Sequence, residues 1–335
     1  MPRLVALDAE PGPDFVARLT AAWKAGDVVF PVDPRLPTPP SFDPPLEHGD
    51  ALVVATSGST GEPKAAVLTH EAVAAAAAAT SARLAVNPPA DRWLCCLPLA
   101  HVGGLSVVTR ALLTGTPLAF EGPATLVSLV RTQLSRMDVT RFRAVLLGGG
   151  PAPADVPDNV VVTYGMTETG GGVVYDGVPL DGVDVRVDDA GQLHLRGPML
   201  LRCYDDGTDP KDADGWFPTG DLGAIDDDGR VVVHGRAADV IVTGGEKVWP
   251  GPVEDVLRTH PLVADVAIAG RPDDEWGERI VAYVVPAAEP PTLDDLRALV
   301  KERLPAWCAP RELVLADALP RTALGKLRRH SLPST

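Results

Sequence analysis

Short apolar segments alternate with helical patterns over residues 51–163, and this alternation limits the fold more than any other feature of the chain. A helical segment at residues 69–86 lies between the first two apolar segments. Thr69 can cap this helix, and six consecutive alanines within it favour helix formation. Strands that alternate with helices predict βαβ units and a mostly parallel sheet. The strand candidates are residues 51–55, 93–98, 117–120, 144–147 and 160–163.

Two other patterns follow along the chain. After Val178 short strands are separated by Asp/Gly turns (DDAG, DDDG), which is typical of antiparallel hairpins. Beyond Arg236 a strand–helix–strand pattern predicts a small α+β domain. We therefore predict an α/β fold with a large N-terminal domain at residues 1–237, built on a mostly parallel sheet plus antiparallel hairpins, and a small C-terminal domain at residues 238–335.

Charge and hydropathy exclude several classes of function. A formal net charge of -15 is unfavourable for a nucleic-acid surface, which needs an excess of Lys and Arg. No apolar run approaches the ~20 residues of a membrane span, and the N-terminus lacks the pattern of a secretory signal. The 4 cysteines include no C-x-x-C pair, so free thiols are expected. We predict a cytoplasmic protein that binds neither nucleic acid nor a membrane.

A loop rich in Ser, Thr and Gly directly follows the first strand candidate and leads toward the predicted helix. Its hydroxyls and flexible glycines allow backbone N–H groups to surround a polyphosphate, and its lysine adds positive charge. The order differs from the P-loop pattern G-x-x-x-x-G-K-[ST]. A Ser/Gly surface turn is the alternative, which the position after a buried strand disfavours. The candidate phosphate-binding residues are Thr56, Ser57, Gly58, Ser59, Thr60, Gly61 and Lys64.

Four more segments follow in order: YGMTET at residues 164–169, TGDL at 219–222, GRAAD at 235–239 continuing as GGEK at 244–247, and PRTALGK at 320–326. With TSGSTGEPK, they resemble the ordered motifs of the adenylate-forming superfamily, which comprises acyl- and aryl-CoA synthetases, adenylation domains and luciferases. The resemblance covers residues 56–326. It implies ATP, Mg²⁺ and coenzyme A as cofactors, and a carboxylic acid as the substrate.

The resemblance implies a role for each motif residue. The nucleotide contacts fall to Tyr164 and Gly165 with Gly149 and Gly150 at the adenine, Thr167 at a phosphate, and Asp221 and Arg236 at the ribose. Glu168 is the implied Mg²⁺ ligand, because a carboxylate can hold a cation that bridges ATP oxygens. Lys64 is implied to act on the leaving pyrophosphate. Lys326 is the implied catalytic cation, since a pre-placed ammonium stabilises charge that builds as the acid attacks the α-phosphorus.

A second half-reaction implies a second arrangement of the C-terminal domain. A rotation at a hinge near residue 238 would withdraw Lys326 and bring Gly244 and Gly245 toward the acyl-adenylate, opening a channel for the thiol. The chain departs from the common pattern at the pivot, where Asp or Lys is usual and Ala238 stands here.

The segment PLAHVGGL at residues 98–105 resembles one found in CoA ligases, and His101 within it is expected to orient the carboxylate or to act near the adenylate. Arg110 interrupts an apolar helical stretch, where it either binds a second acidic group or reaches the surface by snorkelling. Gly170 and Gly171 give the acyl pocket a wall without side chains. Residues 163–187 most resemble the short bacterial o-succinylbenzoate–CoA ligases of menaquinone synthesis, whose substrate has two carboxylates and a ring.

Other functions fit the same residues. The nearest are another acyl- or aryl-CoA ligase and an enzyme that loads a carrier-protein thiol, and a non-catalytic nucleotide-binding module belongs to another class. The early position of the phosphate loop, at Thr56, fits either a naturally short member or a truncated chain. A homodimer is compatible with the sequence.

Overall fold

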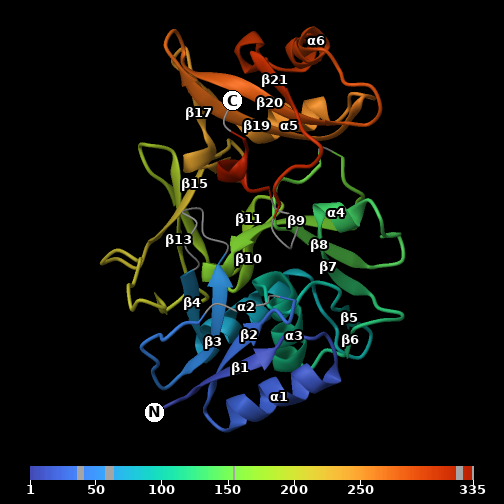
Figure 1. The fold of residues 1–335 in the computed structure, drawn as a ribbon. Coiled ribbons are helices and arrows are strands. Elements are labelled where there is room, and N and C mark those ends of the chain that lie inside the picture. The colour runs from blue at the N-terminus through green and yellow to red at the C-terminus, as the bar shows by residue number, and fades with distance from the viewer. Residues whose placement is uncertain (36–40, 57–63, 154, 322–326, 334–335) are drawn as a thin grey trace. The chain divides into compact units, whose positions relative to one another are not determined.

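The computed structural model describes residues 1–35, 41–56, 64–153, 155–321 and 327–333. The chain forms two compact units (Figure 1). The first contains residues 1–219 and 224–232, and the second contains residues 220–223 and 233–335. The chain passes from the first unit to the second for the last time between Val232 and Val233. The predicted domain boundary after residue 237 lies close to this point, and it stays a prediction.

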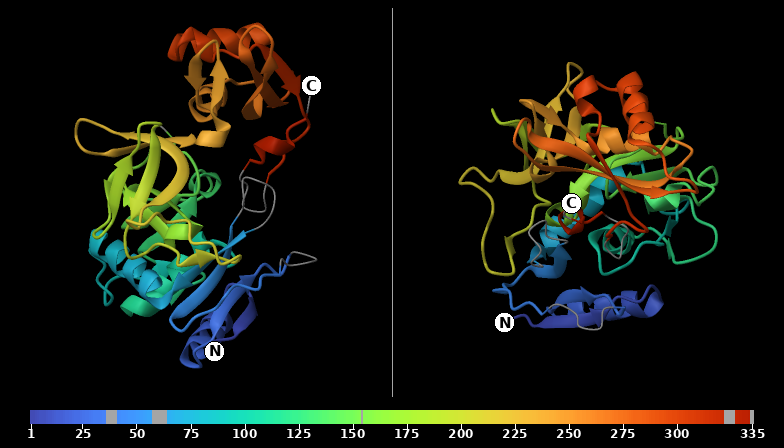
Figure 2. Two further views of the ribbon diagram at one scale, coloured as in Figure 1. Left: turned by 90° about the vertical axis from the view of Figure 1, so that its left-hand side faces the viewer. Right: turned by 45° about the horizontal axis from the view of Figure 1, so that its top comes forward.

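The first unit begins with a five-stranded sheet in the order β1-β2-β3-β4-β14. Strands β1, β2 and β3 are parallel, whereas β4 and β14 are antiparallel to their neighbours. Helix α1 (Pro13–Lys24) packs against β1 and β2, as the N-terminal part of Figure 2 shows. The strands are β1 (Leu4–Asp8), β2 (Val28–Val32), β3 (Asp50–Thr56), β4 (Lys64–Thr69) and β14 (Cys203–Tyr204).

A seven-stranded sheet in the order β11-β10-β9-β8-β7-β5-β6 carries most of the motif residues. Its five strands from β9 to β6 are parallel, and β10 and β11 complete it as antiparallel strands. The predicted mostly parallel sheet is confirmed here. The strands are β5 (Trp93–Leu94), β6 (Leu118–Ala119), β7 (Leu126–Val130), β8 (Ala144–Gly148), β9 (Val160–Met166), β10 (Gly171–Tyr175) and β11 (Val178–Pro179).

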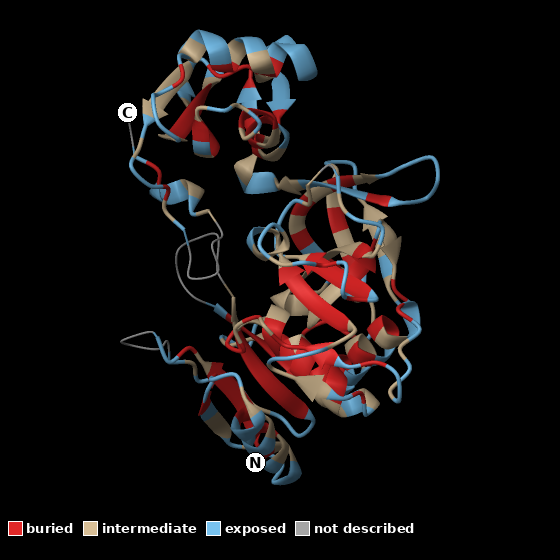
Figure 3. Ribbon diagram, turned by 90° about the vertical axis from the view of Figure 1, so that its right-hand side faces the viewer, coloured by how far each residue is buried: buried red, intermediate tan, exposed pale blue. Residues whose placement is uncertain are grey.

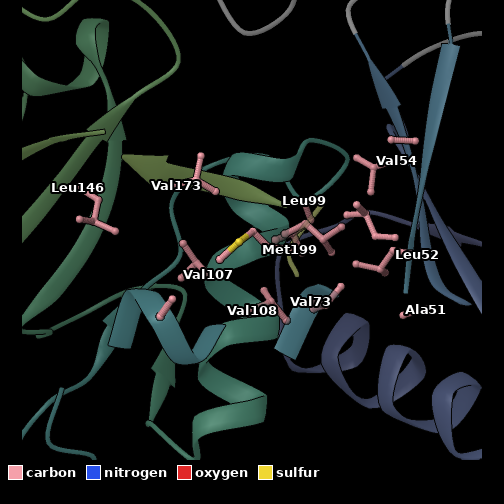
Figure 4. Packing of buried hydrophobic residues seen from close by; sticks show 14 of the residues in the cluster. Ala51, Leu52, Val54, Val73, Leu99, Val107, Val108, Leu146, Val173 and Met199 are labelled. Carbon is pink, nitrogen blue, oxygen red and sulfur yellow. The ribbon is translucent and has the colours of Figure 1, made fainter. Parts of the chain in front are cut away.

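A third sheet has the order β12-β13-β15-β16 and contains the predicted antiparallel hairpin β12/β13. Its strands are β12 (Asp184–Val187), β13 (Gln192–Arg196), β15 (Phe217–Ile225) and β16 (Val231–Arg236). The helices between the first two sheets are α2 (His70–Arg83) and α3 (Val102–Thr114), which lie side by side, and the short α4 (Arg131–Leu134) follows β7. Their apolar faces meet the sheets in one large core (Figure 4).

The second unit has its own sheet, in the order β18-β17-β20-β19, with β21 parallel to β20. Helices α5 (Pro250–Leu257) and α6 (Leu293–Arg303) cover a separate apolar cluster that includes Ile268 and Val284, both fully buried. Buried residues concentrate on the central strands of each unit (Figure 3). The strands are β17 (Ile241–Thr243), β18 (Glu246–Val248), β19 (Val263–Asp273), β20 (Gly277–Pro286) and β21 (Glu312–Leu315).

Strand β4 was not predicted. The Ser/Thr/Gly loop was placed between a strand and a helix, but β4 intervenes before the helix, so Thr56 and Lys64 on the two sides of the loop belong to paired antiparallel strands. Residues 65–68 are buried and pair with β3. Helix α2 then begins where predicted, and the Thr69 hydroxyl accepts a hydrogen bond from the amide of Ala72 at 3.1 Å. The N-terminal end of α2 therefore lies beyond β4 and does not directly follow the loop segment.

Among the described residues, 3₁₀ segments of three residues each occur at Thr167–Thr169, Ala237–Asp239, Ala306–Cys308 and Arg329–Ser331. None of the helices in the described part of the chain combines the length and the apolar character that a bilayer crossing requires.

The substitution Asp91→Asn is expected to lower the free energy of unfolding by about 2 kcal/mol at neutral pH. Asp91 is buried, and Arg143 donates to it at 2.6 and 3.0 Å, which lowers the pKa of the carboxyl to about 2. A depressed carboxyl pKa stabilises the fold above the unfolded-state value, and this contribution is lost as the pH falls toward about 2. Urea unfolding from pH 6 to pH 3 measures the effect.

The exposed Asp227, replaced by Asn, provides the matched control for this stability prediction. We expect the Asp91 deficit to shrink as the pH falls and the control to change little. A deficit of constant size over the whole range would show that the carboxylate's charge is not what stabilises this junction.

Candidate functional site

The YGMTET motif forms a fixed turn between β9 and β10. Thr169 is fully buried, and its hydroxyl accepts a hydrogen bond from the amide of Met166 at 2.9 Å and lies 2.6 Å from the carbonyl oxygen of Gly171. Thr167 and Glu168 occupy the short 3₁₀ turn, and Tyr164 lies on β9 with part of its side chain against the core. The turn therefore presents Thr167 and Glu168 from a rigid base.

Gly165 is fixed by packing as well as by its motif. A Cβ at this position would lie 2.0 Å from the carbonyl oxygen of Gly171, so no other residue fits without moving the paired strand. The sequence gives Gly165 a role at the nucleotide. The structure requires a glycine at this position because β9 and β10 approach each other closely. The role at the nucleotide stays a prediction.

Glu168 and Lys64 are brought together by a tyrosine that the sequence analysis missed. The hydroxyl of Tyr204 on β14 donates to Oε1 of Glu168 at 3.1 Å, and Nζ of Lys64 lies 5.2 Å from the centre of the Tyr204 ring. Thr56 is paired with Lys64 across β3 and β4. Glu168, Tyr204 and Lys64 thus lie close together, although they come from distant parts of the sequence.

The donor set at Glu168 fits a magnesium ion brought in by a nucleotide. Among the described residues, no group of three or more His, Cys, Asp or Glu side chains could hold a metal. Mg²⁺ commonly binds through one or two carboxylates together with substrate phosphates. A single half-buried carboxylate with one oxygen engaged by Tyr204 is consistent with that arrangement.

Arg110 is the most unusual charged residue of the first unit. It lies on α3, is 4% exposed, and has its guanidinium carbon 4.5 Å from the centre of the Trp93 ring. Its Nε and Nη1 atoms are buried and have no hydrogen-bond partner among the described residues. Burial lowers the pKa of Arg110. Of the two alternatives for Arg110, snorkelling to the surface is therefore wrong.

Arg110 lines a small cavity between α2, α3 and the start of β10. Its polar and glycine neighbours there are Thr80, Ser106, Thr109, Gly170 and Gly171. Gly170 and Gly171 have φ values of 65° and 133°, and a Cβ on Gly171 would contact Ser106 at 3.4 Å. Two of the predicted pocket glycines thus lie beside a buried cation, at the place where the sequence suggested the acid.

His101 occupies the position that precedes the first residue of α3. Its pKa is lowered by burial, which Arg35 reinforces and Asp33 opposes, so the ring is neutral at pH 7. Nε2 is buried and has no hydrogen-bond partner within the described ranges. A neutral ring with a free nitrogen can either donate to a carboxylate or accept a proton.

Asp221 and Arg236 form an ion pair within the second unit, with Nε of Arg236 3.0 Å from Oδ1 of Asp221. The structure therefore brings together the two residues that the sequence assigned to the ribose. Gly244 and Gly245 form the turn between β17 and β18, with φ values of 59° and 85°. A Cβ on Gly244 would lie 2.8 Å from the Trp276 ring, so packing alone requires this glycine.

Gly149 and Gly150 follow β8, and Gly149 has a φ of 83°. Six residues with a predicted role lie outside the described part of the chain: Ser57, Gly58, Ser59, Thr60, Gly61 and Lys326.

Residues 39–140 match the AMP-binding enzyme family, and residues 252–326 match the AMP-binding enzyme C-terminal domain. A Mycobacterium tuberculosis (H37Rv) protein named probable 2-succinylbenzoate–CoA ligase is 42% identical over 327 residues, covering 86% of this chain and 85% of that protein. O-succinylbenzoate CoA synthetase of Bacillus subtilis, solved with the acyl-adenylate OSB-AMP, has a TM-score of 0.79 and 27% identity, covering 99% of this chain and 78% of that one. The same synthetase with ATP and magnesium ion has a TM-score of 0.77 at 26% identity, covering 98% and 79%.

Proposed function

Because the chain belongs to the AMP-binding enzyme family, we propose that it ligates 2-succinylbenzoate to coenzyme A at the expense of ATP. A carboxylate oxygen of the acid attacks the α-phosphorus, and pyrophosphate leaves with the electrons of the broken P–O bond. The CoA thiolate then attacks the acyl carbon and AMP leaves. The thioester would serve menaquinone synthesis, and the cytoplasm, where ATP and CoA are both present, is the proposed location.

The observation that carries the choice of acid is the buried guanidinium of Arg110, whose Nε and Nη1 have no hydrogen-bond partner among the described residues. An isolated charge is costly to bury, and an anion with two oxygens offsets that cost when it accepts from the planar donors. A substrate with two carboxylates offers one for adenylation and leaves one for Arg110. The adjacent Gly170 and Gly171 line the same small cavity and add no side chains to it. A long-chain fatty acid has no group that would pair with this cation.

The other residues take the remaining steps. Glu168 would hold the magnesium ion that accompanies ATP, which neutralises phosphate charge, and Thr167 would donate to a phosphate oxygen. Tyr164, Gly149 and Gly150 would contact the adenine, and Asp221 with Arg236 would hold the ribose. His101, neutral and unpartnered at Nε2, would orient the reacting carboxylate. Lys64 would attend the pyrophosphate, and Lys326 would stabilise the charge at the α-phosphorus.

The thiol step would use the second unit. We infer that a change at the hinge near residue 238 withdraws Lys326 and brings the Gly244–Gly245 turn to the adenylate. At Gly245 no atom lies within 4 Å of the place that a Cβ would take, so the backbone there leaves space for the pantetheine arm.

Incubation with ATP, Mg²⁺, CoA and a panel of acids tests the proposal, with mass detection of the thioesters. We expect 2-succinylbenzoyl-CoA and little product from benzoate or fatty acids. Efficient fatty acyl-CoA formation would overturn the substrate. Acid-dependent pyrophosphate release without any CoA thioester would favour an enzyme that loads a carrier protein, and nucleotide binding without pyrophosphate release would favour a non-catalytic module.

A further inference from the structure

Tyr204 lies between two motif residues from distant parts of the chain. Its hydroxyl donates to Oε1 of Glu168, 36 positions away, at 3.1 Å. The face of its ring lies 5.2 Å from Nζ of Lys64, the last residue of the TSGSTGEPK segment. The sequence places Tyr204 in none of the motifs, and neither half-reaction as written above uses it.

The backbone on both sides of this tyrosine is fixed. Strand β14 pairs with β4 so that Tyr204 is opposite Ala66. Next to it, Asp205 accepts from the amide of Ala65 at 2.7 Å and donates its own amide to the carbonyl of Ala65 at 2.9 Å. The amide of Leu201 donates to the carbonyl oxygen of Glu168 at 2.7 Å. The Tyr204 hydroxyl therefore meets Glu168 from a position set by two segments of backbone.

A fixed donor on one carboxylate oxygen sets the orientation of the other oxygen. With Oε1 engaged by the Tyr204 hydroxyl, Oε2 of Glu168 is the oxygen left for a cation. A hydrogen bond to a charged group contributes more than one between neutral groups, so the restraint is energetically significant. The contact of Lys64 with the ring is weak at an exposed site, so this lysine can leave the ring for a phosphate at little cost.

We propose that Tyr204 is a positioning residue for the magnesium–ATP complex. Its hydroxyl orients the Glu168 carboxylate toward the cation, and its ring holds Lys64 near the phosphate site until ATP binds. The inference rests on the proposed function, because it takes Glu168 as the magnesium ligand.

Tyr204→Phe tests the proposal, since it removes the hydroxyl and keeps the ring. Calorimetric titration without acid substrate gives ATP affinity at zero and at increasing Mg²⁺ concentrations. We expect the variant to lose about 10-fold in affinity for the magnesium–ATP complex, the lower range for a hydrogen bond to a charged group. Its affinity for ATP without Mg²⁺ should stay unchanged, as should the KM for the acid. Tyr283→Phe, which removes a hydroxyl that donates to Pro333 in the second unit, is the matched control and should keep the wild-type values.

A double-mutant cycle with Glu168→Gln shows whether the hydroxyl acts through the carboxylate. In the Gln background, Tyr204→Phe should cause little further loss of the Mg²⁺-dependent affinity, because the two residues act as one unit. Additive losses, or an equal loss of affinity with and without Mg²⁺, would show that Tyr204 is merely structural and would overturn the inference alone. A wild-type protein that binds no magnesium–ATP complex would overturn the proposed function as well.

Discussion

Replacement of Arg110 by methionine is expected to reduce kcat/KM for 2-succinylbenzoate by about 10²–10³-fold, with the affinity for ATP unchanged. Loss of one member of a buried charge pair costs about 2–5 kcal/mol in recognition. Methionine is close in length and can keep the packing against Trp93. Steady-state kinetics with the diacid and with its two single-acid analogues, 4-oxo-4-phenylbutanoate and 2-butyrylbenzoate, measures the effect.

The analogues separate a role in recognition from a general loss of activity. Wild-type enzyme should discriminate strongly between the diacid and the single acid that retains the adenylated carboxylate, and Arg110→Met should lose most of that discrimination. Arg136→Met, at an exposed position on the same unit, should behave as wild type. Retained discrimination in Arg110→Met would exclude Arg110 from contact with the substrate.

The same substitution has an expected consequence for stability. Two nitrogens of the buried guanidinium have no hydrogen-bond partner among the described residues, and exchanging such a charge for an apolar side chain is neutral or stabilising. The melting temperature of Arg110→Met should therefore equal or exceed that of wild type. A large decrease would mean that Arg110 stabilises the free fold.

The class of fold and most elements could be predicted, because their signals are local. Thr69 caps α2 through its own side chain, and four of the five parallel strands of the second sheet (β5, β6, β8 and β9) coincide with predicted apolar segments, whereas β7 was not predicted. Strand β4 was missed because both of its faces are buried, which removes the alternation typical of a strand, and because its alanines favour a helix. The strand that follows the predicted phosphate loop was therefore not predicted, and the phosphate role of the loop stays a prediction.

The residues of the candidate site were also predictable only in part. Glu168, Asp221 and Arg110 could be named because motif spacing or an isolated charge in an apolar helix marks them. Tyr204 and Trp93 could not, because only their contacts with Glu168 and Arg110 mark them. Glu168 lies 36 positions from Tyr204, and Arg110 reaches Trp93 through the packing of helix α3 against β5. Gly165 and Gly244 were assigned to the nucleotide and to the thiol step, and these roles stay predictions. The contacts that require a glycine at each position, with Gly171 and Trp276, depend on tertiary packing.

Lys326→Ala is expected to lower the rate of acid-dependent pyrophosphate release by about 10²–10³-fold, because one pre-placed charge at the transition state contributes about 3–4 kcal/mol. Lys326 itself lies outside the described residues, but the chain is held on both sides of it. Arg321 pairs with Leu327 in an antiparallel bridge, and the amide of Arg328 donates to the carbonyl of Pro320 at 2.8 Å. Arg321 also donates to Asp265 at 2.6 and 2.8 Å, which ties this closure to β19.

The two half-reactions distinguish a catalytic cation from a general structural role. Rapid-quench measurement of pyrophosphate reports the first, and synthetic acyl-adenylate mixed with CoA reports the second. Since the ammonium acts only on the charge that forms at the α-phosphorus, Lys326→Ala should form the thioester from the supplied adenylate at close to the wild-type rate. Lys301→Ala, on the exposed face of α6, should leave both steps unchanged. Equal losses in both half-reactions would make Lys326 a structural residue, and undiminished pyrophosphate release would require another cation for the first step.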